Sequence, residues 1–257
     1  MQPRKQMPRM SQPTYSDAEW QTRQDLAACY RLIAHYGMSD LVYNHATARI
    51  PGTEHLLINA YGLLYTEVTA SSLITIDIDG HVIHPGNTDL DVNRAGYVIH
   101  SAVHAARPDV GCVIHTHTRA GMAVSAMACG LLPLTQNAMR FHDIAYHDYE
   151  GPAVDLAERA RLVSDLGTST AMVLRNHGLL VAGATVAQAF NSLYWLEMAC
   201  RAQVDAMAAG TPLTQPPSEV VAKTWTLYQP EVRRPFGEME WPAMRRLADQ
   251  LDACYRD

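Results

Sequence analysis

The chain has 257 residues, of which 48% are hydrophobic and 18% are charged, so it can bury a core of its own and is not a disordered polypeptide. Its formal net charge of −6 provides no basic field for nucleic acid or an anionic membrane, and no apolar run reaches the ~20 residues that span a bilayer. The five cysteines are scattered, with no C-x-x-C pair, and no secretory signal is visible; we therefore expect a cytoplasmic protein with no nucleic-acid or membrane partner.

The first predicted element is a helix. Residues 1–15 hold three prolines and no periodicity, and we interpret them as a flexible arm. Ser16 and Glu19 have the spacing of a capping box, in which each side chain satisfies an amide at a helix start. Apolar residues then recur at helical spacing until Gly37, which is typical of a helix end.

From residue 40 to residue 83 the pattern changes to short β-rich runs separated by glycines. We expect these runs to form strands near 41–43, 46–50, 56–58 and 73–78. The Asp79-Gly80 pair lies between an Ile-rich run and Val82-Ile83, and this arrangement predicts a hairpin turn.

Helices and strands alternate in the rest of the chain. We expect helices over 91–107, 119–129, 152–166 and 185–209, and strands over 112–117, 171–175 and 179–181. This order predicts an α/β or α+β layered domain over 16–212 in which helices pack on a mixed sheet. Prolines after residue 210 indicate a linker, so we expect 213–257 to be a C-terminal extension packed on the domain or on a neighbouring subunit.

The sharpest local signal is the run His115-Thr116-His117. Residues two apart in a strand project from the same face, so the two imidazoles can bind one metal ion. His177 is the best candidate for a third ligand, because it follows an apolar strand and Gly178 allows a tight turn that aims the ring. The alternative is a pair of partly exposed histidines at a strand end.

Several long motifs, in order and correctly spaced, resemble the class II aldolase/adducin family. They cover about residues 20–212 and are closest to its adducin-like bacterial branch. The matching stretches are 92–110, 112–118, 130–133, 145–151, 174–179 and 196–203.

The resemblance implies a three-layer α/β/α fold around a central, mainly antiparallel sheet. It also implies a homotetramer with active sites between neighbouring subunits. Family enzymes hold a divalent ion through an H-x-H pair and a later histidine, which map onto His115, His117 and His177. The ion implied is Zn²⁺, with Fe²⁺, Mn²⁺ and Co²⁺ as alternatives.

The chain departs from the family pattern at residues that carry chemistry. Gly96 stands where family aldolases have a glutamate that moves a proton, and Arg94 and Ala95 stand where the family has phosphate-binding serines. Of a phosphate-binding Gly-Asn pair, Tyr43-Asn44 keeps only the asparagine. Asn44 and Arg94 are candidate substrate-binding residues. Asn44 can equally be a turn residue, and for Arg94 a surface position on a helix is the slightly favoured interpretation.

Other polar residues are weaker candidates. His100 and His104 lie one helical turn apart and can reach a site together, although one of them is expected in the core or an interface. His142, Tyr146 and His147 are possible replacements for the missing acid or base, with structural packing the favoured alternative. The catalytic residue is therefore unknown from the sequence.

These observations predict a divalent-metal-dependent, lyase-like enzyme acting on a small hydroxy, keto or carboxylic substrate. Aldol cleavage or decarboxylation is the expected reaction, and decarboxylation does not require the missing carboxylate base. The alternatives are a non-catalytic, adducin-like oligomerisation module and an Fe(II)-dependent oxygenase on the same fold.

Overall fold

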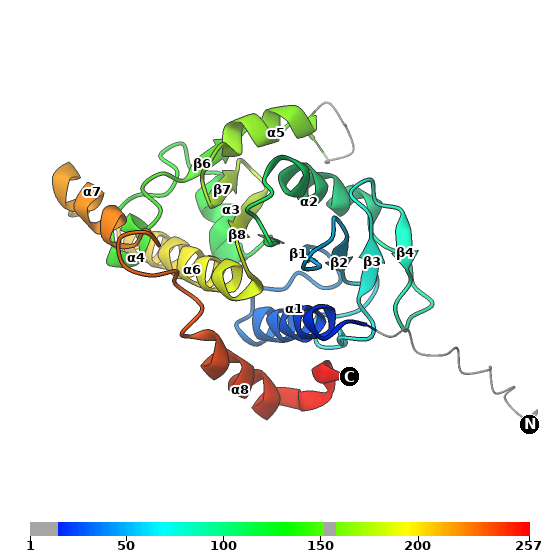
Figure 1. Ribbon diagram of the computed structural model, residues 1–257. Coiled ribbons are helices and arrows are strands. Elements are labelled where there is room, and N and C mark those ends of the chain that lie inside the picture. The colour runs from blue at the N-terminus through cyan, green and yellow to red at the C-terminus, as the bar shows by residue number, and fades with distance from the viewer. Residues whose placement is uncertain (1–14, 152–157) are drawn as a thin grey trace, which may run out of the picture.

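A mainly antiparallel sheet of eight strands runs through the centre of the computed structural model, which describes residues 15–151 and 158–257 but not the side chains of 94–96 (Figure 1). Its strand order is β4-β3-β2-β1-β5-β8-β7-β6. Within the described residues, β6 and β7 pair in parallel and every other neighbouring pair is antiparallel. The strands are β1 (His45–Arg49), β2 (Leu56–Ile58), β3 (Ile74–Ile76), β4 (Val82–His84), β5 (Cys112–Thr116), β6 (Ala145–His147), β7 (Ala171–Leu174) and β8 (Gly178–Gly183).

Helices cover both faces of this sheet and complete three layers. The helices are α1 (Asp17–His35), α2 (Arg94–Ala106), α3 (Arg119–Ser125), α4 (Gln136–Met139), α5 (Glu158–Leu166), α6 (Val186–Ala208), α7 (Ser218–Leu227) and α8 (Trp241–Asp252), followed by the 3₁₀ helix η1 (Ala253–Arg256). Helices α1 and α6 pack on one face, and α2 and α5 pack on the other (Figure 1). The predicted α/β/α fold with a mainly antiparallel sheet is thus confirmed.

Strand β5 shows how the sheet divides the core. Ile114 lies in the apolar cluster with residues of α1 and α6, whereas its neighbour Val113 lies in the cluster with residues of α2 and α5. Since successive side chains of a strand point to opposite faces, His115 shares the face of Val113. The central strands therefore direct this histidine toward the α2 side.

The start of α1 confirms part of the predicted capping box. The Ser16 hydroxyl accepts a hydrogen bond from the Glu19 amide at 3.2 Å. The Glu19 carboxylate does not complete the box in the way we expected, since it accepts a hydrogen bond from Arg23 at 2.9 Å. The guanidinium donor is charged and the amide donor is not, so the carboxylate gains an ion pair from Arg23 that the amide cannot provide, which explains this choice.

The expected strand at 41–43 is wrong. This segment is a turn closed by a bridge between Asp40 and Tyr43, and Leu41 has a left-handed φ of 49°. Strand β1 instead begins at His45, where antiparallel pairing with β5 becomes available. The apolar Leu-Val-Tyr run misled the prediction because β propensity is overridden by context.

Two expected helices differ in extent from those observed. The helix expected over 119–129 ends at Ser125, after which Met127 and Gly130 form turns, and Gly130 has a φ of 63° that a glycine adopts without strain. The helix expected over 152–166 is seen as α5, and the part at 152–157 lies outside the described residues.

The last part of the chain returns to the first helix. The Trp241 indole donates a hydrogen bond to Asp25 of α1 at 2.7 Å, and the Ala70 amide donates to the Tyr255 carbonyl at 2.8 Å. The domain boundary at residue 212 stays a prediction. No helix within 15–151 or 158–257 has both the length and the apolar character required to cross a bilayer.

Candidate metal centre

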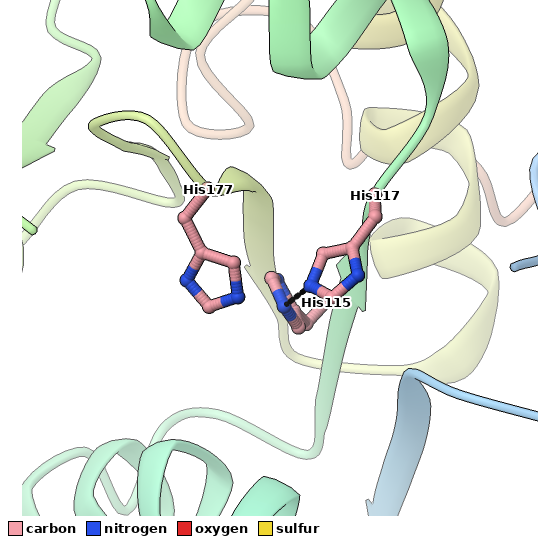
Figure 2. Close-up of side chains that lie close together, drawn as sticks. All are labelled: His115, His117 and His177. Carbon is pink, nitrogen blue, oxygen red and sulfur yellow. Dashed lines mark hydrogen bonds between the residues drawn. The ribbon is translucent and has the colours of Figure 1, made fainter. Parts of the chain in front are cut away.

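Three histidines from two separate parts of the chain converge at the centre of the sheet. His115 lies on β5, His117 follows that strand, and His177 lies in the loop between β7 and β8 (Figure 2). One nitrogen from each ring lies within 4.8 Å of the other two. The three histidines proposed from the sequence therefore lie close together in the structure.

The β7–β8 hairpin positions His177. Leu174 and Gly178 pair across a three-residue loop, in which Asn176 has a left-handed φ of 56°. We expected Gly178 to provide the turn, but Asn176 does so, since asparagine tolerates this conformation. Gly178 is required for close approach, because a Cβ there would lie 2.3 Å from the Thr116 carbonyl oxygen.

Hydrogen bonds fix the orientation of two of the rings. His115 Nδ1 lies 2.8 Å from the Leu179 carbonyl oxygen, and His117 Nδ1 lies 3.1 Å from Asp40 Oδ2. Both oxygens can only accept, so each Nδ1 carries the hydrogen and each neutral ring has an unprotonated Nε2. These two Nε2 atoms face one another at 2.9 Å (Figure 2). Two opposed lone pairs are a favourable arrangement only when a cation lies between them or a proton is shared.

The surroundings also keep the rings uncharged. Burial lowers the pKa of His115 well below its ordinary value, and the nearby His177 and His117 add to this effect. Burial lowers the pKa of His177 to about 4, with a further contribution from His117. Imidazole must be neutral to bind a metal ion, so these two rings are prepared as ligands at neutral pH. The donor set of three imidazoles fits a divalent ion.

Asn44 lies next to this centre, one residue before β1. Its side chain is 2% exposed, and neither its Oδ1 nor its Nδ2 has a hydrogen-bond partner among the residues that the structure describes. It also has a left-handed φ of 68°, so it fits both interpretations from the sequence, a turn residue and a polar contact for a ligand. The backbone at Arg94 and Gly96 is described as part of α2, but the side chain of Arg94 is not.

Two of the weaker candidates are buried behind the triad. His100 and His104 face the sheet from α2, and both rings bond to the hydroxyl of Thr47 on β1. Their spacing suggested that both rings could reach one site, and both do reach the Thr47 hydroxyl. Both rings are also buried.

The three remaining candidates are engaged elsewhere. His147 Nδ1 bonds to Asp165 at 2.7 Å, and the Tyr146 hydroxyl accepts from the Leu131 amide at 3.0 Å. The ring of His142 packs edge-on against that of Trp225. Packing and local hydrogen bonding therefore account for all three.

Asp40 and His45 are two polar residues at the site that sequence analysis did not identify. Asp40 is far from His117 in sequence, and only the turn at 40–43 brings its carboxylate to the ring. His45 lies opposite His115 in the β1–β5 pairing, and burial lowers its pKa to about 4, with an added effect from His117. Alternation along β1, with polar residues at His45 and Thr47, was the signal available for the second residue.

Comparisons with known proteins agree with this architecture. The family model of the class II aldolase and adducin N-terminal domain matches residues 24–204. The crystal structure of an aldolase II superfamily protein from Pseudomonas syringae has a TM-score of 0.88 and 48% identity, with 95% of this chain and 98% of that chain covered.

Two further proteins represent different functions within the same family. Alpha-adducin from Mus musculus is 44% identical over 250 residues, which cover 92% of this chain but only 34% of alpha-adducin. The structure of an L-fuculose 1-phosphate aldolase from Glaciozyma antarctica has a TM-score of 0.83 and 29% identity, with 95% of this chain and 96% of that chain covered. From the family model and these relatives, the chain belongs to the class II aldolase and adducin family.

Proposed function

We propose that this protein is a divalent-metal-dependent, lyase-like enzyme whose ion is held by His115, His117 and His177. The observation that carries this proposal is the pair of Nε2 atoms of His115 and His117, which face one another at 2.9 Å with His177 beside them. Zn²⁺ is the favoured ion, because three imidazole ligands leave a fourth position open for water or substrate. Fe²⁺, Mn²⁺ and Co²⁺ are the alternatives.

The residues around the triad have distinct tasks in this proposal. A bound divalent ion would act as a Lewis acid that stabilises negative charge on a substrate oxygen. The Leu179 carbonyl and the Asp40 carboxylate orient His115 and His117 by accepting their Nδ1 hydrogens. Asn44 provides an amide with free hydrogen-bonding capacity for a substrate oxygen. Arg94 remains a proposed second contact for a carboxylate or phosphate group.

The reaction is cleavage of a carbon–carbon bond in a small hydroxy, keto or carboxylic substrate. Gly96 offers no carboxylate to move a proton, so a decarboxylation, in which the leaving group is CO₂, suits this chain better than the standard aldol cleavage. We also propose that the protein is a homo-oligomer, with a tetramer favoured, because class II aldolases typically form oligomers.

A second candidate function is a non-catalytic, adducin-like oligomerisation module. The identity of 44% to alpha-adducin over 92% of this chain favours it, as does the glycine at position 96. The intact triad with its two oriented rings favours the enzyme, because an assembly module has no need for three converging imidazole nitrogens.

Metal analysis separates the two candidates. The full chain is purified without added metal, and its metal content is measured for the wild type, His115→Ala, His177→Ala and the exposed control His81→Ala. The enzyme requires about one ion per chain in the wild type and the control, and loss of the ion in the other two variants. It also requires metal-dependent turnover in a screen of small hydroxy and keto acids. A folded oligomer with no ion and no turnover would support the module.

A further inference from the structure

A second cluster of histidines lies directly behind the triad, and His45 connects the two. His45 on β1 is the Cα partner of His115 on β5, so both side chains are on the α2 face of the sheet. The His45 side chain is only 5% exposed. Its pairing with His115 places it beside the triad.

The hydrogen-bonding pattern of His45 leaves one donor free. Asn93 Nδ2 lies 3.5 Å from His45 Nε2, and an amide nitrogen can only donate, so Nε2 is the acceptor. The hydrogen of the neutral ring is therefore on Nδ1. That atom is buried and has no hydrogen-bond partner within the described part of the chain.

An unused donor in this place is costly for a purely structural residue. Burial of a polar group without a partner typically costs about 1–3 kcal/mol, so native structures seldom retain one. The adjacent residue, Asn44, has the same property at both polar atoms of its side chain. Two neighbouring side chains beside the triad thus have hydrogen-bonding capacity that the protein itself does not use.

The other two histidines support His45 from behind. The rings of His45 and His100 pack edge-on with centroids 5.3 Å apart. Thr47 Oγ1 lies 2.9 Å from His100 Nδ1 and 2.8 Å from His104 Nε2. A hydroxyl can both donate and accept, so this one group joins the two rings. The chain from His104 through Thr47 to His100 is a fixed support against which His45 packs.

We propose that His45 is a ligand-binding residue that donates its Nδ1 hydrogen to an oxygen of the molecule bound at the triad. His100, Thr47 and His104 are positioning residues that hold its ring. The neutral N–H of His45 and the amide of Asn44 suit the carboxylate or carbonyl oxygen of a small hydroxy acid or oxo acid. This inference rests on the proposed function, because the ligand must first reach a metal ion at the triad.

Glycolate binding to the Co²⁺-loaded protein tests the donor. The visible spectrum of the Co²⁺ protein reports binding of this hydroxy acid in the full chain. His45→Asn retains an N–H near the position of Nδ1, whereas His45→Gln places its amide near Nε2 and His45→Leu has no donor. We expect His45→Asn to bind glycolate within about threefold of the wild type, and His45→Gln and His45→Leu to bind it at least about tenfold more weakly. All three variants should retain stoichiometric Co²⁺.

A matched pair of Thr47 variants tests the positioning residues. Thr47→Val removes the hydroxyl that joins His100 and His104, and Thr47→Ser restores it. We expect Thr47→Val to weaken glycolate binding about threefold to tenfold and Thr47→Ser to recover it. A role in folding alone would lower stability in Thr47→Val without changing the glycolate affinity of the folded fraction.

Nitrogen NMR of the wild type covers the case in which a His45 variant fails to fold. With ¹⁵N-labelled histidine in the Zn²⁺ protein, the His45 ring should have the Nδ1–H tautomer, and its Nδ1 resonance should shift on addition of glycolate. An Nε2–H tautomer, or glycolate binding unchanged in His45→Leu, would overturn this inference and leave the metal site intact. Failure to bind Co²⁺ in the wild type would instead overturn the proposed function itself.

Discussion

The triad of His115, His117 and His177 and the buried trio of His45, His100 and His104 lie on the same face of one sheet but differ in how their nitrogens are used. In the triad, nitrogens converge within 4.8 Å and two of them face one another at 2.9 Å. In the trio, two rings bond to a single hydroxyl and are separated by it. The difference shows that the partners of a ring, more than its spacing, determine whether it can bind a metal ion.

The hydrogen-bond partner of each ring explains the contrast. His115 and His117 have strict acceptors at Nδ1, which leaves Nε2 unprotonated. His100 and His104 bond to a hydroxyl, which can donate or accept, so this partner does not by itself fix which nitrogen of either ring is unprotonated. The triad thus has the arrangement that the proposed metal site requires, and the trio is arranged as a hydrogen-bonded support.

The largest expected effect is on Zn²⁺ affinity, which substitutions in the triad should lower and substitutions in the trio should not. His117→Ala removes one of three proposed ligands, so we expect its Zn²⁺ affinity to fall at least about 100-fold, beyond the effect typical of residues that only orient a ligand. His104→Gln should retain the affinity of the wild type. Competition titration with a chromophoric chelator measures both. Equal loss in the two variants would contradict the distinction between the clusters.

A smaller effect is expected where the backbone shapes the triad. Gly178→Ala introduces a Cβ at 2.3 Å from the Thr116 carbonyl oxygen and 3.2 Å from His117 Cδ2, so the strand must shift near the ligands. We expect a loss of about 1–3 kcal/mol in the free energy of unfolding, together with weaker Zn²⁺ binding. Gly210→Ala is the control: its φ of +65° adds strain of about 1–2 kcal/mol, but open space surrounds it. That variant should bind Zn²⁺ like the wild type.

The sequence predicted the triad because its signal is local. The spacing of His115 and His117 places both rings on one strand face, and His177 follows an apolar strand that was also predicted correctly. The order of helices and strands followed from the same periodicities. The family resemblance added the layered fold and the link between the two histidine segments.

Those local signals could not predict the contacts of the trio or the hydrogen-bond partners of the triad. The spacing of His100 and His104 indicates a shared helix face but not that Thr47, from another element, lies between them. Asp40 and His117 are 77 positions apart, and the segment that joins Asp40 to β1 was predicted as a strand although it is a turn. Contacts that depend on the pairing of distant strands leave no periodic pattern in the sequence.

The buried trio should make the free energy of unfolding decrease in acid. Burial holds the pKa of His45 at about 4 and that of His104 at about 3, and it also lowers the pKa of His100. An unfolded histidine has a pKa near 6.5, so below that pH the unfolded chain takes up protons that the native protein does not. Stability is therefore complete above pH 6.5 and falls toward pH 4, by up to about 1.4 kcal/mol per pH unit for each ring.

Urea unfolding of the metal-free protein between pH 7.5 and pH 5 measures this slope. In His104→Gln, which cannot titrate but retains a polar group for Thr47, we expect the slope to decrease by an amount that approaches about 1.4 kcal/mol per pH unit near pH 5. A slope equal to that of the wild type would mean that His104 is protonated in the native state, which contradicts its place in the neutral support.

The smallest effect concerns Asp40, which is half exposed and touches the triad only through His117. Asp40→Ala removes the acceptor that fixes the Nδ1–H tautomer of this ring, and we expect about tenfold weaker Zn²⁺ binding. Asp40→Asn retains an acceptor oxygen without the charge, so it should lose less. Chelator competition at constant pH and salt measures both variants. If Asp40→Ala bound Zn²⁺ like the wild type, the orientation of His117 would have to come from its backbone alone, and the argument from strict acceptors would hold only for His115.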